Sequence, residues 1–232
     1  MRLVNYQQFI SESETKTSYS FDELPKESQK AAIEKNRDWG VESDDWYTPI
    51  IEGFEEDMEG YGIEDVKCSF TGFYSQGDGA SFTGKISDNV KFIFDTLGMG
   101  NVPPLSFLDK LDQIKLASGI KEKMLKSLRE DLYIWIERTD SRYSHENTVR
   151  VNLEHASDED FDVKIGLEGK MNLNFAELLD KIEGRATEWV RGKSRELYRE
   201  LWKYFEELQS DEYVADALRD NDYEFDINGN II

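Results

Sequence analysis

Hydrophobic and polar side chains alternate along two arms between Val66 and Ile86. A period of two is typical of β-strands with one buried face, and Phe73 is the single apolar exception on the polar side of this pattern. Between the arms lies Gln76-Gly77-Asp78-Gly79, whose glycines reach positive φ without a Cβ clash. We therefore predict a β-hairpin here, and we expect the rest of the fold to form around it.

Apolar residues with a period of three to four predict helices on both sides of this hairpin. Short polar side chains that accept backbone hydrogen bonds stand at several of the expected starts. We expect helices over residues 22–39, capped by Asp22; 45–59, capped by Ser43 or Asp44; 88–97, capped by Ser87 or Asp88; 174–208; and 211–218, capped by Ser210 or Asp211. Further apolar residues predict a helical insertion at about 100–130.

Two segments, Tyr133–Ile136 and Val149–Glu154, are rich in β-branched and aromatic residues and predict a second pair of strands. Phe161–Leu167 predicts a fifth strand, and Tyr223–Ile227 predicts a last one. This order indicates an α+β fold, in which an antiparallel sheet built around the hairpin packs against a layer of helices that includes one long C-terminal helix. We expect residues 1–20 to form a flexible lead-in or an edge strand, and residues 21–232 to form a single domain.

The chain has a strong excess of acid, with 49 Asp and Glu residues against 28 Lys and Arg residues and a formal net charge of -21. Such a charge opposes direct binding to nucleic-acid phosphates or to anionic membranes, so we expect neutral or basic partners. The one cysteine, Cys68, has no intramolecular disulfide partner, and no segment is apolar over the length that a bilayer requires. We expect a soluble cytoplasmic protein; its oligomeric state does not follow from these features.

From Glu42 to Asp65 the chain has ten carboxylates and neither Lys nor Arg. This acidic run covers the predicted helix 45–59 and admits two interpretations. It is either the solvated side of an amphipathic helix, the usual meaning of a charge run, or a surface that imitates a nucleic-acid backbone and occupies a basic groove on another protein. The candidate partner-binding residues are Asp44, Asp45, Glu52, Glu55, Glu56, Asp57 and Glu59.

The predicted turn also admits two interpretations. Its glycines and Asp78 need only form a tight hairpin turn, which is the interpretation that we favour. More small polar side chains surround it than a turn requires, so its backbone amides could also hold a phosphate or a carboxylate. In this alternative the chain is a small-ligand or nucleotide-binding module, with candidate residues Tyr74, Gln76, Gly77, Asp78, Gly79, Ser81 and His145.

The sequence has no recognisable catalytic or metal-binding pattern. A phosphate-binding loop, a serine nucleophile elbow and a zinc-binding HExxH helix are all missing. The spacing of His145 and His155 fits no zinc pattern, and Cys68 lies in an alternating strand, where burial makes a thiol inert. We expect no enzyme activity, no catalytic residue, no metal and no cofactor.

Three segments together resemble a known family. The first is Phe21-Asp-Glu-Leu with the later Asp44-Asp45-Trp46-Tyr47, the second runs from Gly72 to Gly84, and the third runs from Ser210 to Phe225. With them the chain resembles an uncharacterised phage protein family with a GFxSQGDGAxFxG signature, some members of which are labelled "antitoxin of toxin-antitoxin stability system". The hairpin segment is the most specific of the three.

The resemblance implies an intracellular accessory protein of a phage or mobile element, and it provides no catalytic residues to transfer. Together with the acidic run, it predicts an anti-defence role. The protein would bind and inhibit or modulate a host or defence protein that has a basic surface, for instance by acidic mimicry of DNA. An antitoxin that neutralises a cognate toxin is a further alternative and would use the same chemistry. We expect no direct contact with nucleic acid or with a membrane.

Overall fold

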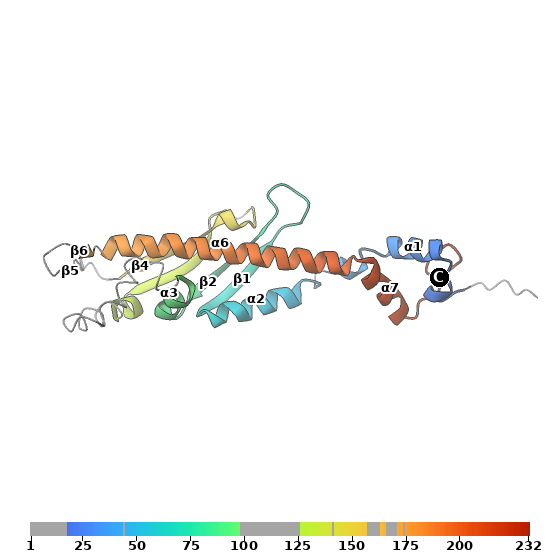
Figure 1. Ribbon diagram of the computed structural model, residues 1–232, viewed down its shortest axis with the longest axis horizontal. Coiled ribbons are helices and arrows are strands. Elements are labelled where there is room, and N and C mark those ends of the chain that lie inside the picture. The colour runs from blue at the N-terminus through green and yellow to red at the C-terminus, as the bar shows by residue number, and fades with distance from the viewer. Residues whose placement is uncertain are drawn as a thin grey trace, which may run out of the picture. The chain divides into compact units, whose positions relative to one another are not determined.

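The computed structural model describes residues 18–43, 45–97, 126–140, 142–156, 163–165, 171–173 and 175–232 (Figure 1). The chain divides into two compact units. Met1–Tyr47 and Lys203–Ile232 contribute to one, which we call the terminal unit, and Thr48–Trp202 forms the other, which we call the sheet unit. Compact units of this kind can belong to one folding domain, so the single domain expected over residues 21–232 stays a prediction.

The sheet unit contains a four-stranded antiparallel sheet in the order β1-β2-β3-β4. Strands β1 (Ile63–Phe70) and β2 (Ala80–Ile86) form the predicted hairpin. Strands β3 (Leu132–Arg138) and β4 (Val149–His155) form the second predicted pair, in which Tyr133 lies opposite Glu154. The α+β fold class predicted from the sequence is therefore confirmed.

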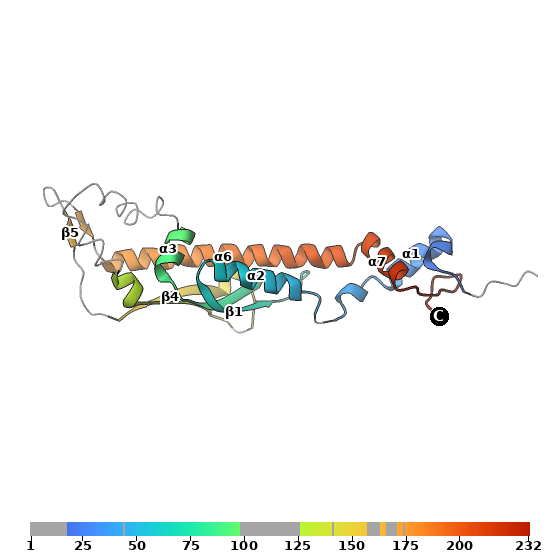
Figure 2. The same ribbon diagram turned by 90° about the horizontal axis from the view of Figure 1, so that it is seen from below.

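Helices cover one face of this sheet. They are α2 (Thr48–Gly60), α3 (Asn89–Leu97) and the long α6 (Phe175–Leu208). Figure 2 shows the strands on one side of these helices, and no described helix lies over the opposite face of the sheet. Aromatic rings join the helical layer: the Trp189 ring of α6 lies 5.0 Å from Tyr61 and 5.6 Å from Phe92, both with edge-to-face geometry. The sheet unit therefore has one helix-covered face, and we call the other its open face.

The outer edge of β4 is covered by α6. The Val151 amide donates a hydrogen bond to the Thr187 hydroxyl at 3.0 Å, and the Arg191 guanidinium donates one to the Val149 carbonyl at 3.1 Å. An unpaired strand edge is a template for aggregation, and side chains of a neighbouring helix can satisfy its backbone groups. The long helix thus both packs on the sheet and closes one of its edges.

Two shorter strands, β5 (Val163–Ile165) and β6 (Met171–Leu173), pair antiparallel with each other and form a separate sheet. Of the predicted strand Phe161–Leu167, only β5 lies within the described residues, and β5 does not join the main sheet. Of the helical insertion predicted at about 100–130, only residues 126–130 are described, and they are helical. The rest of that prediction lies outside the described residues.

The terminal unit contains the short 3-10 helices η1 (Phe21–Glu23) and η2 (Trp39–Val41) and the helices α1 (Lys26–Lys35) and α7 (Asp211–Asp220). Its core is apolar and consists of Phe21, Leu24, Ala32, Ile33, Val214, Ala215, Leu218 and Phe225. A loop after Phe225 packs directly on α1. Gly229 has a φ of +75°, and a Cβ there would lie 2.3 Å from the Ser28 carbonyl oxygen, so only glycine fits.

Several predicted element bounds are wrong in this unit. Asp22 does not cap α1, because it lies within η1 and its carboxylate accepts a hydrogen bond from Arg219 at 2.9 Å. Pro25 stands at the N-cap of α1 instead, and the helix ends at Lys35. The predicted strand Tyr223–Ile227 is absent. Phe225 makes single bridges, because the Asp226 carboxylate accepts backbone hydrogen bonds from two later residues and so turns the chain back.

The other predicted helix starts had mixed outcomes. Helix α2 begins at Thr48 and not at residue 45, because a helix from residue 45 would need an amide hydrogen that Pro49 lacks. Asp88 caps α3 by accepting from the Lys91 amide at 2.9 Å. Ser210 caps α7 by accepting from the Tyr213 amide at 3.2 Å. Both of these caps were among the predicted alternatives.

Candidate functional site

Helix α2 is fixed to the sheet by one apolar stripe. Phe54 and Met58 lie one turn apart and are almost fully buried. The Phe54 ring meets Phe82 of β2 edge to face, with 5.1 Å between ring centroids. Because a helix turns by about 100° per residue, this stripe leaves the opposite side of α2 toward solvent.

Three of the predicted partner-binding residues occupy that solvent side. Glu52, Glu56 and Glu59 are exposed, and helical geometry places them within an arc of about 60°. No Lys or Arg among the described residues makes an ion pair with any of the three. We call these three glutamates the acidic face of α2.

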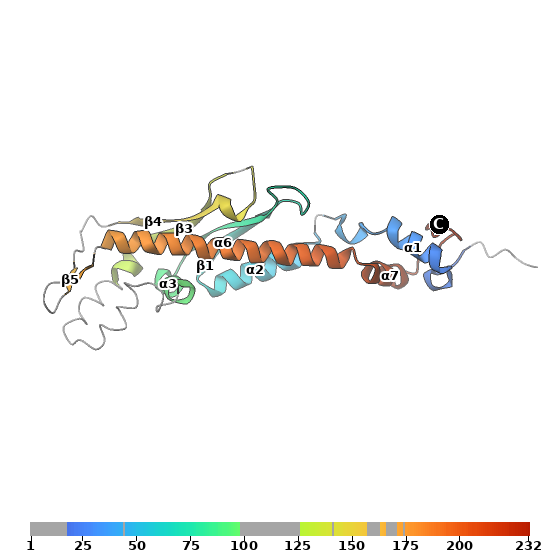
Figure 3. The same ribbon diagram turned by 45° about the horizontal axis from the view of Figure 1, so that its top comes forward.

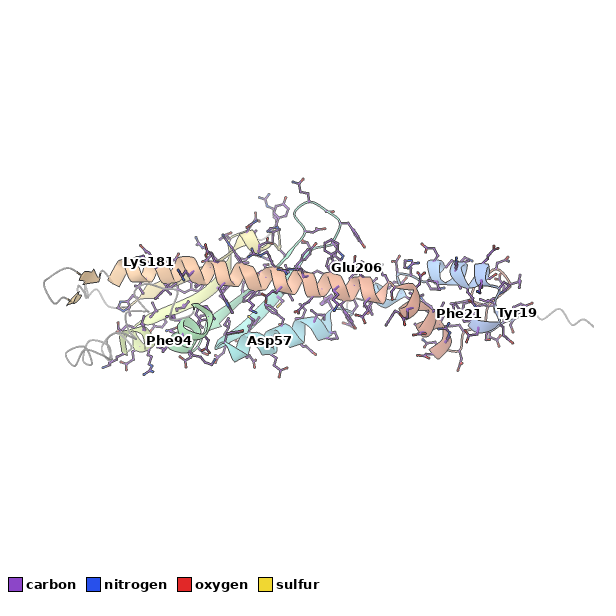
Figure 4. All side chains as sticks on the ribbon, in the orientation of Figure 1. Tyr19, Phe21, Asp57, Phe94, Lys181 and Glu206 are labelled. Atoms are coloured by element: carbon purple, nitrogen blue, oxygen red, sulfur yellow. The ribbon has the colours of Figure 1, made fainter. Side chains whose placement is uncertain are left out.

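Two further predicted acids lie at the edges of this face. Burial raises the pKa of the Cys68 thiol to about 12, and the nearby Glu55 carboxylate adds to the rise, which places Glu55 on the side of β1. Asp57 of α2 (Figure 4) lies close enough to α6 for its charge to act on Lys193, which places it at the other edge. Burial lowers the pKa of Lys193, but the hydrogen bond to Glu196 and the charge of Asp57 contribute to a net rise.

The two remaining predicted acids do not belong to this group. Asp44 lies outside the described residues. Asp45 is exposed in a turn before α2 and is counted in the terminal unit. The structure therefore brings together five of the seven predicted acids, three at the centre of one helix face and two at its edges.

The open face of the sheet also carries acids. Two of them lie opposite cations, whereas Glu154 lies opposite Tyr133. Glu64 lies opposite Lys85 across β1 and β2, and the neighbouring Asp65 carboxylate is 2.8 Å from the Lys85 ammonium. Glu137 lies opposite Arg150 across β3 and β4, and their charged groups form an ion pair. Opposite charges on directly opposed residues stabilise a sheet, whereas like charges there would destabilise it.

The predicted turn is longer than the four residues Gln76–Gly79, because β1 ends at Phe70 and β2 starts at Ala80. Inside this connection the Asp78 carboxylate accepts a hydrogen bond from the Ser75 amide at 2.6 Å. The Thr71 amide donates to the Gly79 carbonyl at 3.0 Å. Gly77, at φ +97°, provides the left-handed position that the turn needs. Several hydrogen-bonding groups of the turn, including the Asp78 carboxylate, are therefore already bonded within the loop.

The β1–β2 and β3–β4 connections project side by side (Figure 3). A Cβ at Gly79 would lie 3.0 Å from the His145 ring and 3.1 Å from the Ser144 carbonyl oxygen, so the two loops pack closely. The other predicted ligand residues diverge: Tyr74 is 78% exposed, whereas Ser81 is buried within β2. Gln76 is exposed. The ligand site at this turn stays a prediction, and the structure gathers only part of its residues.

Neither histidine makes a metal-like arrangement. The His145 ring Nδ1 accepts a hydrogen bond from the Asn147 amide at 3.1 Å, and the His155 Nε2 lies 2.7 Å from the Ser127 hydroxyl. Among the described residues no three His, Cys, Asp or Glu side chains come together as metal ligands would. Within the same residues, no helix is long and apolar enough to cross a bilayer.

A family model described as a domain of unknown function, DUF8835, matches residues 46–211. That range covers more than half of the chain and includes α2, the four-stranded sheet and the hairpin. The chain belongs to the DUF8835 family. No curated protein and no solved structure matches it. The phage family stays a prediction, although its most specific segment, Gly72–Gly84, lies within the DUF8835 range.

The DUF8835 region also contains residues at the hairpin whose role the sequence analysis missed. Phe73 is buried, with its ring centroid 5.6 Å from that of Tyr198 and 6.2 Å from that of Trp202. The Tyr198 hydroxyl donates to the Gly72 carbonyl at 3.3 Å. Phe73 broke the alternation of its strand, and Tyr198 and Trp202 are one turn apart on a helix. From the sequence, these two features together could have predicted a contact between the β1–β2 loop and α6.

Proposed function

We propose that the chain is a non-enzymatic binding module that docks the acidic face of α2 onto a basic surface of another protein. The observation that supports this proposal is the absence of any cation partner for Glu52, Glu56 and Glu59 among the described residues. These carboxylates stand on a helix that Phe54 and Met58 hold in place. A fixed array of like charges loses little entropy on meeting a complementary surface and speeds the encounter.

The density of charge on α2 resembles that of a nucleic-acid strand. From Glu52 to Glu59 the helix rises by about 10.5 Å, at 1.5 Å per residue. With Glu55 and Asp57 at the edges, five carboxylates occupy this length, which is about one charge per 2.6 Å. One DNA strand has a charge about every 3.4 Å and the duplex one about every 1.7 Å, so the helix falls between the two. This density supports the proposal of nucleic-acid mimicry.

The absence of cations on α2 is local. Elsewhere in the described chain, Lys and Arg residues repeatedly pair with acids. Arg37, for example, contacts both Glu34 and Asp211. Acids on the solvated side of a helix are often interspersed with lysines three or four residues away, and α2 has none. A partner that supplies the missing cations would remove the mutual repulsion.

In the organism that encodes it, we propose that the protein is a phage-type accessory factor and that its partner is a host or defence protein with a basic nucleic-acid groove. The resemblance of the hairpin segment to phage proteins supports this role. An antitoxin that covers a basic toxin would use the same face. The identity of the basic partner separates these two proposals.

Capture of a partner from host cells tests the proposal. The immobilised native chain, the variant Glu52→Gln/Glu56→Gln/Glu59→Gln and a control variant with three neutralised acids on the sheet, Glu64→Gln/Glu137→Gln/Glu154→Gln, are compared. We expect a captured protein that duplex DNA displaces, that high salt releases and that the α2 variant alone fails to retain. Equal capture by all three proteins at every salt concentration would refute the acidic face as the docking surface.

A further inference from the structure

The open face of the sheet has an irregularity in β1. Glu64 lies opposite Lys85 and Lys67 lies opposite Thr83, so β1 has one residue more than β2 between these pairs. Asp65, inside this bulge, has a φ of 53°, and only one other non-glycine residue among those described has a positive φ. Bulges re-aim side chains and are common next to binding sites, and a strained residue such as Asp65 is typical of such places.

A hollow of about 410 Å³ lies directly beside the bulge. Its walls come from β1, β2 and β3 and consist of Asp65, Lys67, Thr83, Gly84, Lys85, Trp135 and Ile136. Two ammonium groups and one carboxylate therefore line it. The lining side chains have a net positive charge, although Glu64 lies beside them opposite Lys85, in a chain whose formal net charge is -21.

The two lysines are not equivalent. Lys85 is held by Asp65, with 2.8 Å between the ammonium nitrogen and the carboxylate oxygen. Lys67 is exposed and makes no ion pair with a described residue. It is therefore available to an anionic group from outside the chain. Thr83 neighbours both lysines, because it lies opposite Lys67 and two residues before Lys85 on the same face of β2.

Trp135 supplies an aromatic surface to the same hollow. Its indole N–H donates a hydrogen bond to the Glu137 carboxylate at 3.4 Å, so the polar atom of the ring is already used. What remains for a ligand is the π-surface. Tyr133, 59% exposed, lies two residues earlier on the same face of β3, about 6.7 Å along the strand.

We propose that this hollow binds a mononucleotide, with its phosphate at Lys67 and Lys85 and its base stacked on Trp135. Ammonium groups bind phosphate as point charges, and aromatic side chains on an open sheet stack on bases. An uncharged ligand would gain no electrostatic attraction from Lys67. A long nucleic acid would be repelled by the overall negative charge of the chain, which a single phosphate group feels much less. The site lies on the face of the sheet opposite to α2, so it is independent of the proposed docking function.

Calorimetric titration of the full chain with AMP, ribose 5-phosphate and inorganic phosphate at low salt tests this site. The variants are Lys67→Gln, with Lys67→Arg as the charge-conserving control, and Trp135→Leu, with Trp202→Leu as the control for loss of an indole elsewhere. We expect AMP to bind with the highest affinity. Lys67→Gln should weaken AMP by at least about fivefold, while Lys67→Arg and Trp202→Leu should leave it within about twofold.

Trp135→Leu should also weaken AMP by at least about fivefold and should abolish its advantage over ribose 5-phosphate. Melting curves show whether each variant is folded. If Trp135→Leu does not fold, the Lys67 variants still test the site, because Lys67 is exposed and its substitution should leave the fold intact. Three results would overturn the proposal: no heat from millimolar AMP with the native chain, equal binding of AMP and inorganic phosphate, or binding of a single-stranded oligonucleotide but not of AMP. The last would reassign the face to a polynucleotide.

Discussion

The acidic face of α2 and the open face of the sheet lie on opposite sides of the sheet unit, and both are rich in carboxylates. On the sheet, Glu64 and Glu137 each lie directly opposite a cation, because strand register fixes which residues face each other. On α2, Glu56 and its two neighbours on the face have no cation partner among the residues that the structure describes. The excess of acid in this chain is therefore unevenly compensated. Strand register pairs opposite charges at these positions of the sheet, whereas the helix face has no cation partner among the described residues.

The comparison depends first on the attachment of α2 to the sheet. Phe54→Ala should lower the free energy of unfolding by about 3–5 kcal/mol, because it removes a buried ring and leaves a cavity beside Phe82. Chemical denaturation measures this change, and Tyr133→Ala on the open face is the matched control, expected to cost much less. Similar losses for both variants would mean that α2 is not held by the Phe54 stripe.

Two glycine-to-alanine substitutions compare the room for an added methyl group in the sheet and on α2. Gly84→Ala should destabilise by about 1–3 kcal/mol, because the new Cβ would lie 2.8 Å from Ile63 and 3.2 Å from the Glu64 carbonyl oxygen beneath the bulge. Gly53→Ala on α2 should stabilise by about 0.5–1 kcal/mol, since nothing lies within 4 Å of the added methyl group and alanine favours a helix. Thermal unfolding of both variants gives the two signs, and the same sign for both would contradict this packing.

The paired acids of the sheet should respond to pH. The hydrogen bond from Arg150 holds the pKa of Glu137 below its ordinary value of 4.5. A carboxyl group whose pKa is lower in the folded state stabilises the folded state at pH values above the pKa that it has in the unfolded chain. This stabilisation is lost as the pH falls through the pKa of the folded state. Glu137→Gln should therefore cost up to about 1 kcal/mol at pH 7, and the difference from the native chain should vanish in acid. Urea denaturation across this range measures it, and a constant difference would show that the ion pair is not responsible.

The smallest expected effect concerns the thiol between the two regions. Burial raises the pKa of Cys68 to about 12, and Glu55 adds to it, so alkylation at pH 8 should be slow in the folded chain. Glu55→Gln should speed it modestly, because one nearby negative charge is removed while burial remains. Mass spectrometry of iodoacetamide-treated protein follows the rate. Fast alkylation of the native chain would show that Cys68 is open to solvent.

Strong periodicity made much of the fold predictable. The hairpin, the second strand pair and the long helix each extend over enough residues for the pattern to specify the element. The bounds failed where one residue changed the local hydrogen bonding. Pro49 moved the start of α2, and Asp226 turned back the chain that was expected to continue as a strand.

The candidate surfaces were less predictable, because they depend on register and on contacts between distant segments. The run from Glu42 to Asp65 showed many acids, but only the burial of Phe54 determines which of them share a face. The hollow beside Asp65 results from a one-residue bulge that no alternation pattern reveals. The contact of Phe73 with α6 joins residues more than a hundred positions apart.

The most direct test of the uncompensated acidic face is the affinity of an oligolysine peptide for two matched variants. Glu52→Gln/Glu56→Gln/Glu59→Gln removes three carboxylates from α2, and Glu64→Gln/Glu137→Gln/Glu154→Gln removes three from the sheet, so each changes the formal net charge from -21 to -18. Calorimetric titration at several salt concentrations should show weaker binding and a shallower salt dependence for the α2 variant only. Equal losses in the two variants would show that the peptide responds to net charge and not to this face.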